Sequence, residues 1–155
     1  MKIFGLLIVM SICFCSVPAQ TKIPKFSDYS VSEVYKGKNA PVRIDSDSRL
    51  FKTRLRWAVR NQKPNFAGRY ILTFWGCGTS CIQGAAIDAK TGTVYWWGFS
   101  TASIDAEEKV KYRLNSRLII FHGLRNEEDG DNGDHYYQFN GRKFVHVKTV
   151  LFEDQ

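Results

Sequence analysis

Residues 67–88, AGRYILTFWGCGTSCIQGAAID, decide the fold that the sequence predicts. The first half alternates between two faces, as a half-buried strand does. One face carries Tyr70, Leu72 and Phe74, and the other carries Arg69, Ile71, Thr73 and Trp75. Residues 81–88 have the composition of a second strand, and the glycine-rich residues before them predict a tight corner. The stretch therefore predicts two neighbouring strands joined by a short turn.

Strand patterns continue from this pair to residue 151. They are TVYWWGF at 93–99, SRLIIFHG at 116–123, and HYYQF and RKFVHV at 135–139 and 142–147. Residues 101–115 are a polar connection between two of them. The Asn140-Gly141 pair predicts a two-residue type I′ hairpin turn, since both residues tolerate a positive φ. We expect five or six strands over residues 66–151, arranged as a mostly antiparallel meander.

A helix is expected before the sheet, at residues 46–63. Residues 46–48, Ser-Asp-Ser, offer N-caps, and Pro64 cannot continue a helix. At 100° per residue, the apolar side carries Phe51, Leu55, Ala58 and Val59. Residues 20–45 have no sustained period, which predicts an extended arm. The predicted fold class is α+β, with one N-terminal amphipathic helix packed on the sheet, in a single globular domain at residues 20–155.

The first 19 residues have the pattern of a secretory signal peptide. Lys2 precedes an uncharged apolar run at residues 3–15, and the small residues at 17–19 suit a signal peptidase. An uncleaved anchor is the alternative, but the run is short for a membrane span. A lipoprotein is disfavoured, because bulky residues precede Cys13 and Cys15. We therefore expect an exported protein, periplasmic or extracellular, with no membrane span after residue 19.

The chain resembles a family of short exported bacterial proteins of unassigned function. The shared motifs are F-A-G-x-Y at residues 66–70, W-G-C-G-T-x-C at 75–81, D-x-x-T-G-x-V-Y at 88–95, N-S-R-L at 115–118 and a final Y-Y hairpin. The resemblance covers nearly all of residues 20–155 and implies export, while leaving function open. One position departs from the pattern: Arg69 stands where related chains often have His, which disfavours a general base there.

Cys77 and Cys81 are the two cysteines that remain after removal of the signal peptide. In an oxidising compartment, two cysteines this close in sequence usually form a disulfide, so we expect a structural staple at the corner. A redox pair is the alternative, but thiol–disulfide enzymes generally use C-x-x-C at a helix N-terminus. A zinc site would need two further ligands, and no His or Cys pair has ligand spacing.

The corner is also a candidate ligand loop. Its backbone N–H groups and hydroxyls could turn toward one anion, with an arginine on the same face of the preceding strand. The candidate residues are Arg69, Trp75, Gly76, Gly78, Thr79, Ser80 and Gln83. A turn solvated by water is the simpler interpretation, because glycine-rich turns are common.

The predicted helix carries a basic face opposite its apolar side. The residues of this face are Arg49, Lys52, Arg56, Arg60 and Lys63. Between Arg43 and Arg69 the chain has eight Lys or Arg and two Asp, so the excess positive charge is concentrated here. Such a face suits an acidic protein, a glycan or a phosphate-bearing envelope component. Export disfavours nucleic acid as a partner, and a merely solvated helix face is the alternative.

Other sites receive less support from the sequence. The acidic run at residues 126–134 lacks the glycine and glutamate positions of an EF-hand, so a hairpin loop is favoured over calcium binding. His122, His135 and His146 fall in or beside strands without a recognisable nucleophile motif, and are expected to be structural. We expect no metal and no cofactor.

The function that follows from the sequence is exported, non-catalytic binding, as in an envelope-associated factor or an inhibitor. The alternative is a small envelope enzyme that uses the glycine-rich Cys77–Cys81 loop with Arg69. No catalytic residue can be named from the sequence.

Overall fold

The computed structural model describes residues 22–102, 110–126 and 130–153, so the expected signal peptide at residues 1–19 lies outside the described residues. The helical elements are η1 (Phe26–Tyr29), η2 (Arg49–Phe51) and α1 (Lys52–Asn61). The strands are β1 (Tyr70–Gly76), β2 (Cys81–Asp88), β3 (Val94–Trp96), β4 (Thr101–Ala102), β5 (Val110–Tyr112), β6 (Leu118–Arg125), β7 (Asn132–Phe139) and β8 (Phe144–Leu151). Among the helices of the described ranges, none has the length and apolar character needed to cross a membrane.

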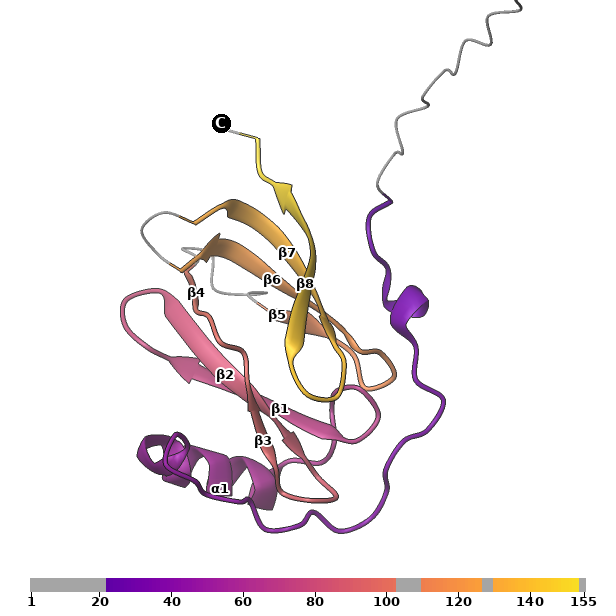
Figure 1. The fold of residues 1–155 in the computed structure, drawn as a ribbon, viewed down its shortest axis with the longest axis vertical. Coiled ribbons are helices and arrows are strands. Elements are labelled where there is room, and N and C mark those ends of the chain that lie inside the picture. The colour runs from indigo at the N-terminus through magenta and orange to yellow at the C-terminus, as the bar shows by residue number, and fades with distance from the viewer. Residues whose placement is uncertain (1–21, 103–109, 127–129, 154–155) are drawn as a thin grey trace, which may run out of the picture.

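All eight strands belong to one antiparallel sheet. Its main order is β1-β2-β4-β6-β7-β8, while β3 pairs with β2 and β5 pairs with β6. The two-residue strand β4 joins the half formed by β1–β3 to the half formed by β5–β8. Figure 1 shows these halves as two layers, with α1 against the outer side of β1–β3.

The inner faces of the two halves pack around an aromatic core. Its buried members are Phe66, Ala67, Tyr70, Leu72, Ala86, Trp97, Ile119, Phe121, Tyr137, Phe139 and Phe144. Ring centroids of Tyr70 and Phe139 lie 4.7 Å apart, and those of Trp97 and Phe121 lie 4.5 Å apart, both edge-on. Each such contact contributes about 1 kcal/mol beyond its buried area. These contacts hold the two layers together.

The outer face of β1–β3 is covered by α1. The buried residues of the helix are Leu55, Ala58 and Val59. Phe51, just before α1, places its ring 5.0 Å from that of Trp75 and 5.4 Å from that of Trp96. Trp96 therefore lies beneath the helix, while Trp97 lies in the aromatic core, as strand geometry requires of adjacent residues.

The segment before the helix runs along the sheet and is bonded to its turns. The Tyr35 N–H donates to the Gly68 carbonyl at 2.9 Å, and the Arg43 N–H donates to the Gly92 carbonyl at 2.8 Å. Both glycines have a positive φ, and a Cβ at either would collide with a backbone carbonyl of the passing segment. Glycine is therefore required where the arm crosses these two turns.

The helix is shorter than the predicted range of 46–63, and it is not N-terminal, because the described arm from residue 22 precedes it. Ser48 is buried and its hydroxyl accepts the Asp45 N–H at 2.7 Å, so residues 45–48 form a hydrogen-bonded turn before η2. Neither η2 nor α1 has a side-chain cap at its N-terminus, so the expected N-cap bond from residues 46–48 is not formed. At the other end, the Asn39 amide donates to the carbonyls of Val59 and Gln62 at 2.8 Å each. These bonds satisfy orphan carbonyls and end the helix before Pro64.

The predicted strands are all present, but the sheet has eight strands rather than five or six. The two additional strands, β4 and β5, lie in the stretch expected to be a polar connection. They are two and three residues long, too short for alternation to reveal. The broader prediction of a mostly antiparallel sheet with one short helix is confirmed.

The hairpin between β7 and β8 also differs from its prediction. Phe139 pairs with Phe144, so the loop has four residues rather than two. Gly141 has φ 92, but Asn140 is not among the residues with positive φ, which a type I′ turn requires. The Asn140 side chain instead accepts the backbone N–H groups of Arg142 and Lys143 at 3.0 Å each. This side-chain bonding replaces the two-residue turn.

Candidate functional site

The Cys77–Cys81 disulfide closes the corner between β1 and β2. The two Cα atoms lie 5.2 Å apart, and the Cys77 N–H donates to the Cys81 carbonyl at 3.1 Å. Gly76 pairs with Ile82, so the ladder continues up to the staple. Ser80 has φ 59, a left-handed conformation that the small ring imposes on a residue other than glycine. The disulfide therefore fixes the geometry of an exposed strand-to-strand corner.

The structure separates Arg69 from the rest of the candidate ligand loop. Arg69 precedes the first residue of β1, whereas the loop follows its last residue, so roughly 20 Å of strand lies between them. Arg69 binds Asp88 instead, with Nη2 2.9 Å from a carboxylate whose side chain is 2% exposed. Its guanidinium also lies over the Tyr70 ring, 5.2 Å from the centroid. Arg69 thus neutralises a buried carboxylate at the other end of the strand.

The remaining loop residues divide between the corner and the helix side of the sheet. Gly76, Gly78, Thr79 and Ser80 are all exposed at the corner. Trp75 is 6% exposed beneath α1, and Gln83 pairs with it across β1 and β2. The enzyme alternative, which needs Arg69 and the loop together, therefore has no assembled site at the corner.

All five residues of the predicted basic face are exposed. They are Arg49, Lys52, Arg56, Arg60 and Lys63. None of them forms an ion pair with another residue of ranges 22–102, 110–126 and 130–153. Arg56 and Arg60 also line a hollow of about 620 Å³ between α1 and the arm, together with Lys38. The face thus presents uncompensated positive charge.

A groove on the other side of α1 lies next to this face. It has a volume of about 500 Å³. Its lining comes from α1, from the segment after the helix, from β1 and from β5: Thr53, Arg54, Trp57, Gln62, Asn65, Leu72, Thr73, Phe74, Trp75 and Tyr112. Trp57 is 57% exposed and Phe74 is 42% exposed, so the groove has two aromatic side chains open to solvent. Thr53 and Trp57 lie next to the basic face on the circumference of the helix, so the groove and the face are neighbours.

Two buried polar atoms in the groove have no hydrogen-bond partner among the described residues. They are Gln62 Oε1, an acceptor, and Trp75 Nε1, a donor. Arg54, which lies outside the basic face, places its guanidinium 6.0 Å from the Trp75 ring centroid. A buried polar atom without a partner costs about 1–3 kcal/mol. A ligand that supplied the missing partners would recover this cost.

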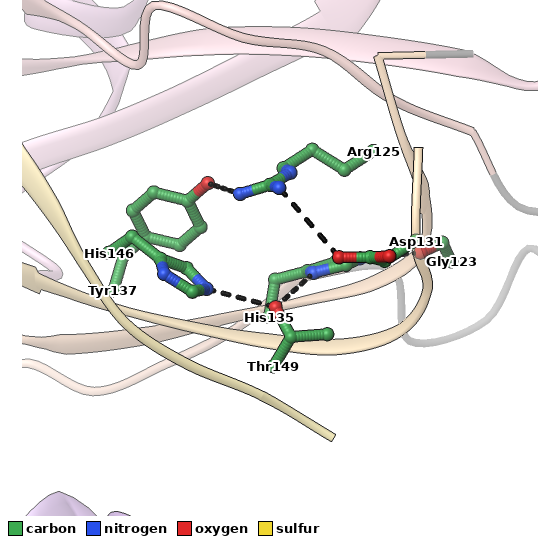
Figure 2. Close-up of polar contacts among 7 residues, drawn as sticks. All are labelled: Gly123, Arg125, Asp131, His135, Tyr137, His146 and Thr149. Carbon is green, nitrogen blue, oxygen red and sulfur yellow. Dashed lines mark hydrogen bonds and ion pairs between the residues drawn. The ribbon is translucent and has the colours of Figure 1, made fainter. Parts of the chain in front are cut away.

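A second polar cluster lies on β6–β8, on the far side of the aromatic core from α1. His135 is fully buried, and its Nε2 lies 2.8 Å from the Gly123 carbonyl. Its Nδ1 lies 3.0 Å from Thr149 Oγ1, and His146 Nε2 lies 2.9 Å from the same oxygen. Figure 2 shows the two histidine rings on either side of this hydroxyl. The cluster therefore centres on one threonine.

Arg125, Tyr137 and Asp131 extend this group of side chains. We call the whole set the histidine cluster: Gly123, Arg125, Asp131, His135, Tyr137, His146 and Thr149. Arg125 Nη1 donates to the Tyr137 hydroxyl at 3.2 Å, and its Nη2 lies 3.9 Å from Asp131. Partial desolvation, followed by the electrostatic influence of Arg125 and of the neighbouring His135, lowers the pKa of His146 below its ordinary value of 6.5. The neutral form of His146 is thereby favoured at neutral pH.

A β-bulge brings these side chains onto one face. Tyr136 pairs with Lys148 but Tyr137 pairs with His146, so one residue of β8 is left without a partner in the register. His146 and Thr149 are an odd number of residues apart and would otherwise face opposite sides of the strand. The bulge removes that difference, as bulges beside functional sites often do. The sequence contains no signal for it.

The other expected sites are not assembled. His122 forms a separate pair with Asp134, with Nδ1 2.8 Å from the carboxylate. Over the described ranges, no group of three or more His, Cys, Asp or Glu residues is placed to hold a metal ion. Residues 127–129 of the acidic run lie outside the described part, so the calcium alternative is not placed.

Comparisons with protein-family models, with curated proteins and with solved structures found no match.

Proposed function

We propose that the protein is an exported binding protein that holds an acidic segment of an envelope protein. The segment would lie along the basic face of α1 and in the adjacent groove. The observation that carries the proposal is the pair of buried polar atoms in that groove that find no partner in the described part of the chain. They lie beside a helix face that forms no ion pair with any described residue. Export rests on the N-terminal pattern and on the resemblance to a family of exported proteins.

The groove suits a polypeptide better than a glycan or an isolated phosphate. Gln62 Oε1 needs a donor and Trp75 Nε1 needs an acceptor, and a peptide group supplies one of each. Trp57 and Phe74 offer aromatic surface for an apolar side chain of the partner. Arg54 and the basic face then favour carboxylates on the flanking residues, through complementary charge.

The edge of β1 supports an extended segment. The backbone N–H and carbonyl of Leu72 point away from β2. They bond to the side chain of Asn65, at 2.7 Å and 3.2 Å respectively. By the alternation of an antiparallel strand, Phe74 points its N–H and carbonyl the same way. Gly84, opposite Phe74, directs its carbonyl to Trp97 instead, which agrees with this alternation. An added strand could bond to Phe74 beside the groove.

Affinity capture from an envelope extract, followed by crosslinking, tests the proposal. The oxidised protein is the bait, and a variant with Arg49, Arg56 and Arg60 changed to Glu is compared with it. We expect an acidic protein to be captured by the wild type and lost by the variant, because repulsion replaces attraction along the whole face. A photo-crosslinker placed at Trp57 should label an extended acidic segment of that protein.

A matched control changes Lys90, Arg142 and Lys143 to Glu. These residues are exposed, belong neither to α1 nor to the lining of the groove, and give the same change in net charge. The control should retain the partner, which separates a specific face from a general effect of charge. Retention of the partner by the folded Arg49/Arg56/Arg60 variant would overturn the proposal.

A further inference from the structure

The hydrogen bonds of the histidine cluster fix the direction in which each proton is donated. The Gly123 carbonyl can only accept, so Nε2 of His135 carries a hydrogen. In a neutral ring, the form that can act as a base, Nδ1 is an acceptor, and Thr149 then donates its one hydroxyl hydrogen to it at 3.0 Å. His146 Nε2 must therefore donate to Thr149 Oγ1 at 2.9 Å. The result is a hydroxyl whose proton already points at a basic nitrogen.

This arrangement has the three parts of an activated nucleophile: a hydroxyl, a base in hydrogen-bond contact, and a group that orients the base. Gly123 is the orienting residue, and its φ of 113 lies in the left-handed region that favours glycine. Its carbonyl reaches a ring that is fully buried on the neighbouring strand. Thr149 is half-buried and His146 is exposed, so the hydroxyl lies at the boundary between the core and solvent.

We propose that this cluster is a catalytic site for hydrolysis of small carboxylic esters, with Thr149 as the nucleophile and His135 as the general base. Thr149 Oγ1 forms a bond to the carbonyl carbon while its proton passes to Nδ1 of His135. The ester C–O bond then breaks, and the alcohol leaves with that proton. A water molecule then passes a proton to Nδ1 of His135 as its oxygen attacks the acyl carbon. The bond from that carbon to Thr149 Oγ1 breaks, Oγ1 takes the proton back from His135, and the carboxylic acid leaves.

The neighbouring residues suit this reaction. Arg125, whose side chain is 28% exposed, brings a positive charge to the cluster, where it donates a hydrogen bond to the Tyr137 hydroxyl. A positive charge near the site favours the oxyanion that develops when Thr149 attacks. His146 holds the oxygen of Thr149 in position through its Nε2–H and acts as a positioning residue. Esters suit the site because an alcohol leaves with less proton assistance than an amine does.

Reaction with p-nitrophenyl acetate tests the proposal. The purified, oxidised protein is mixed with this activated ester, and its peptides are mapped by tandem mass spectrometry. We expect acetylation at Thr149 and a burst of p-nitrophenol, since the acyl-enzyme forms faster than it hydrolyses. Mapping is essential, because lysine side chains also react with this reagent. Acetyl groups on lysines alone would overturn the proposal without any variant.

Two pairs of variants make the test specific. Thr149→Ser keeps the hydroxyl and should keep the labelling, whereas Thr149→Val should abolish it. His135→Gln keeps a donor for Gly123 and an acceptor for Thr149 but cannot take up a proton. We expect it to slow acylation about 100-fold, the usual contribution of a general base. His122→Gln, in the separate pair with Asp134, should leave the rate unchanged. Equal rates in the His135 and His122 variants would overturn the role of His135.

Discussion

The groove beside α1 and the histidine cluster on β6–β8 differ in whether their buried polar atoms have hydrogen-bond partners. In the groove, Gln62 Oε1 and Trp75 Nε1 are buried without partners in the described part of the chain. In the cluster, both ring nitrogens of the buried His135 are bonded within the chain. The first pattern leaves free energy to be recovered by a ligand, whereas the second is already complete.

This difference is the one expected between a site that binds a partner and a site that catalyses a reaction. A site that must recognise a partner benefits from polar groups that only the partner satisfies. A site that must activate a hydroxyl needs its groups held in fixed directions before any substrate arrives. The groove is lined by α1, the segment after it, β1 and β5, whereas the histidine cluster lies on β6–β8 and the loop after β6. The two regions therefore share no residue and can be changed separately.

The largest expected effect is on stability, from His135→Ala. This change leaves a cavity in the core and strips the Gly123 carbonyl and the Thr149 hydroxyl of a partner. We expect a loss of about 3 kcal/mol in the free energy of unfolding, measured by urea denaturation. His122→Ala is the matched change at a half-buried histidine, and should cost less than about 1 kcal/mol. Similar losses in the two variants would show that the cluster is not a tightly bonded unit.

A smaller effect, of opposite sign, is expected in the groove. Gln62→Met keeps the length of the side chain and removes the unpartnered acceptor, while its backbone carbonyl still accepts from Asn39. Because no bond within the described residues is lost, the free energy of unfolding should stay constant or rise by up to about 1 kcal/mol. A marked loss of stability in urea denaturation would mean that Gln62 already has a partner, and the contrast between the two regions would disappear.

The fold was largely predictable because its signals are local. Alternation along residues 70–76 placed Tyr70 and Leu72 on the core face, and the helical period placed Leu55 and Val59 against the sheet. The disulfide was predicted from the short spacing between Cys77 and Cys81 and from the expected export to an oxidising compartment. The strands β4 and β5 were missed, because two or three residues hold no period and their pairing is decided by distant neighbours.

The residues of the candidate sites are brought together by strand register, which local patterns do not determine. A two-residue turn at Asn140-Gly141 would have placed His146 opposite His135. The four-residue loop and the bulge place Thr149 there instead. The pairing of Arg69 with Asp88, and the lack of a partner for Gln62 Oε1 among the described residues, likewise depend on how the chain folds around these side chains. Local patterns therefore did not predict which residues these sites bring together.

The smallest expected effect is a dependence of stability on pH that arises from the cluster and not from the groove. Burial, then Arg125 and His135, lowers the pKa of His146 below 6.5, so the unfolded chain binds more protons than the folded chain just below that pH. The free energy of unfolding should therefore fall as the pH drops through this window. Carboxylates such as Asp45, whose pKa is lowered from 3.8 mainly by hydrogen bonds from Ser48, contribute only at lower pH. Urea denaturation between about pH 5 and 7.5 should show a smaller slope in His146→Gln than in the wild type. Equal slopes in the two proteins would show that the titration responsible lies outside the histidine cluster.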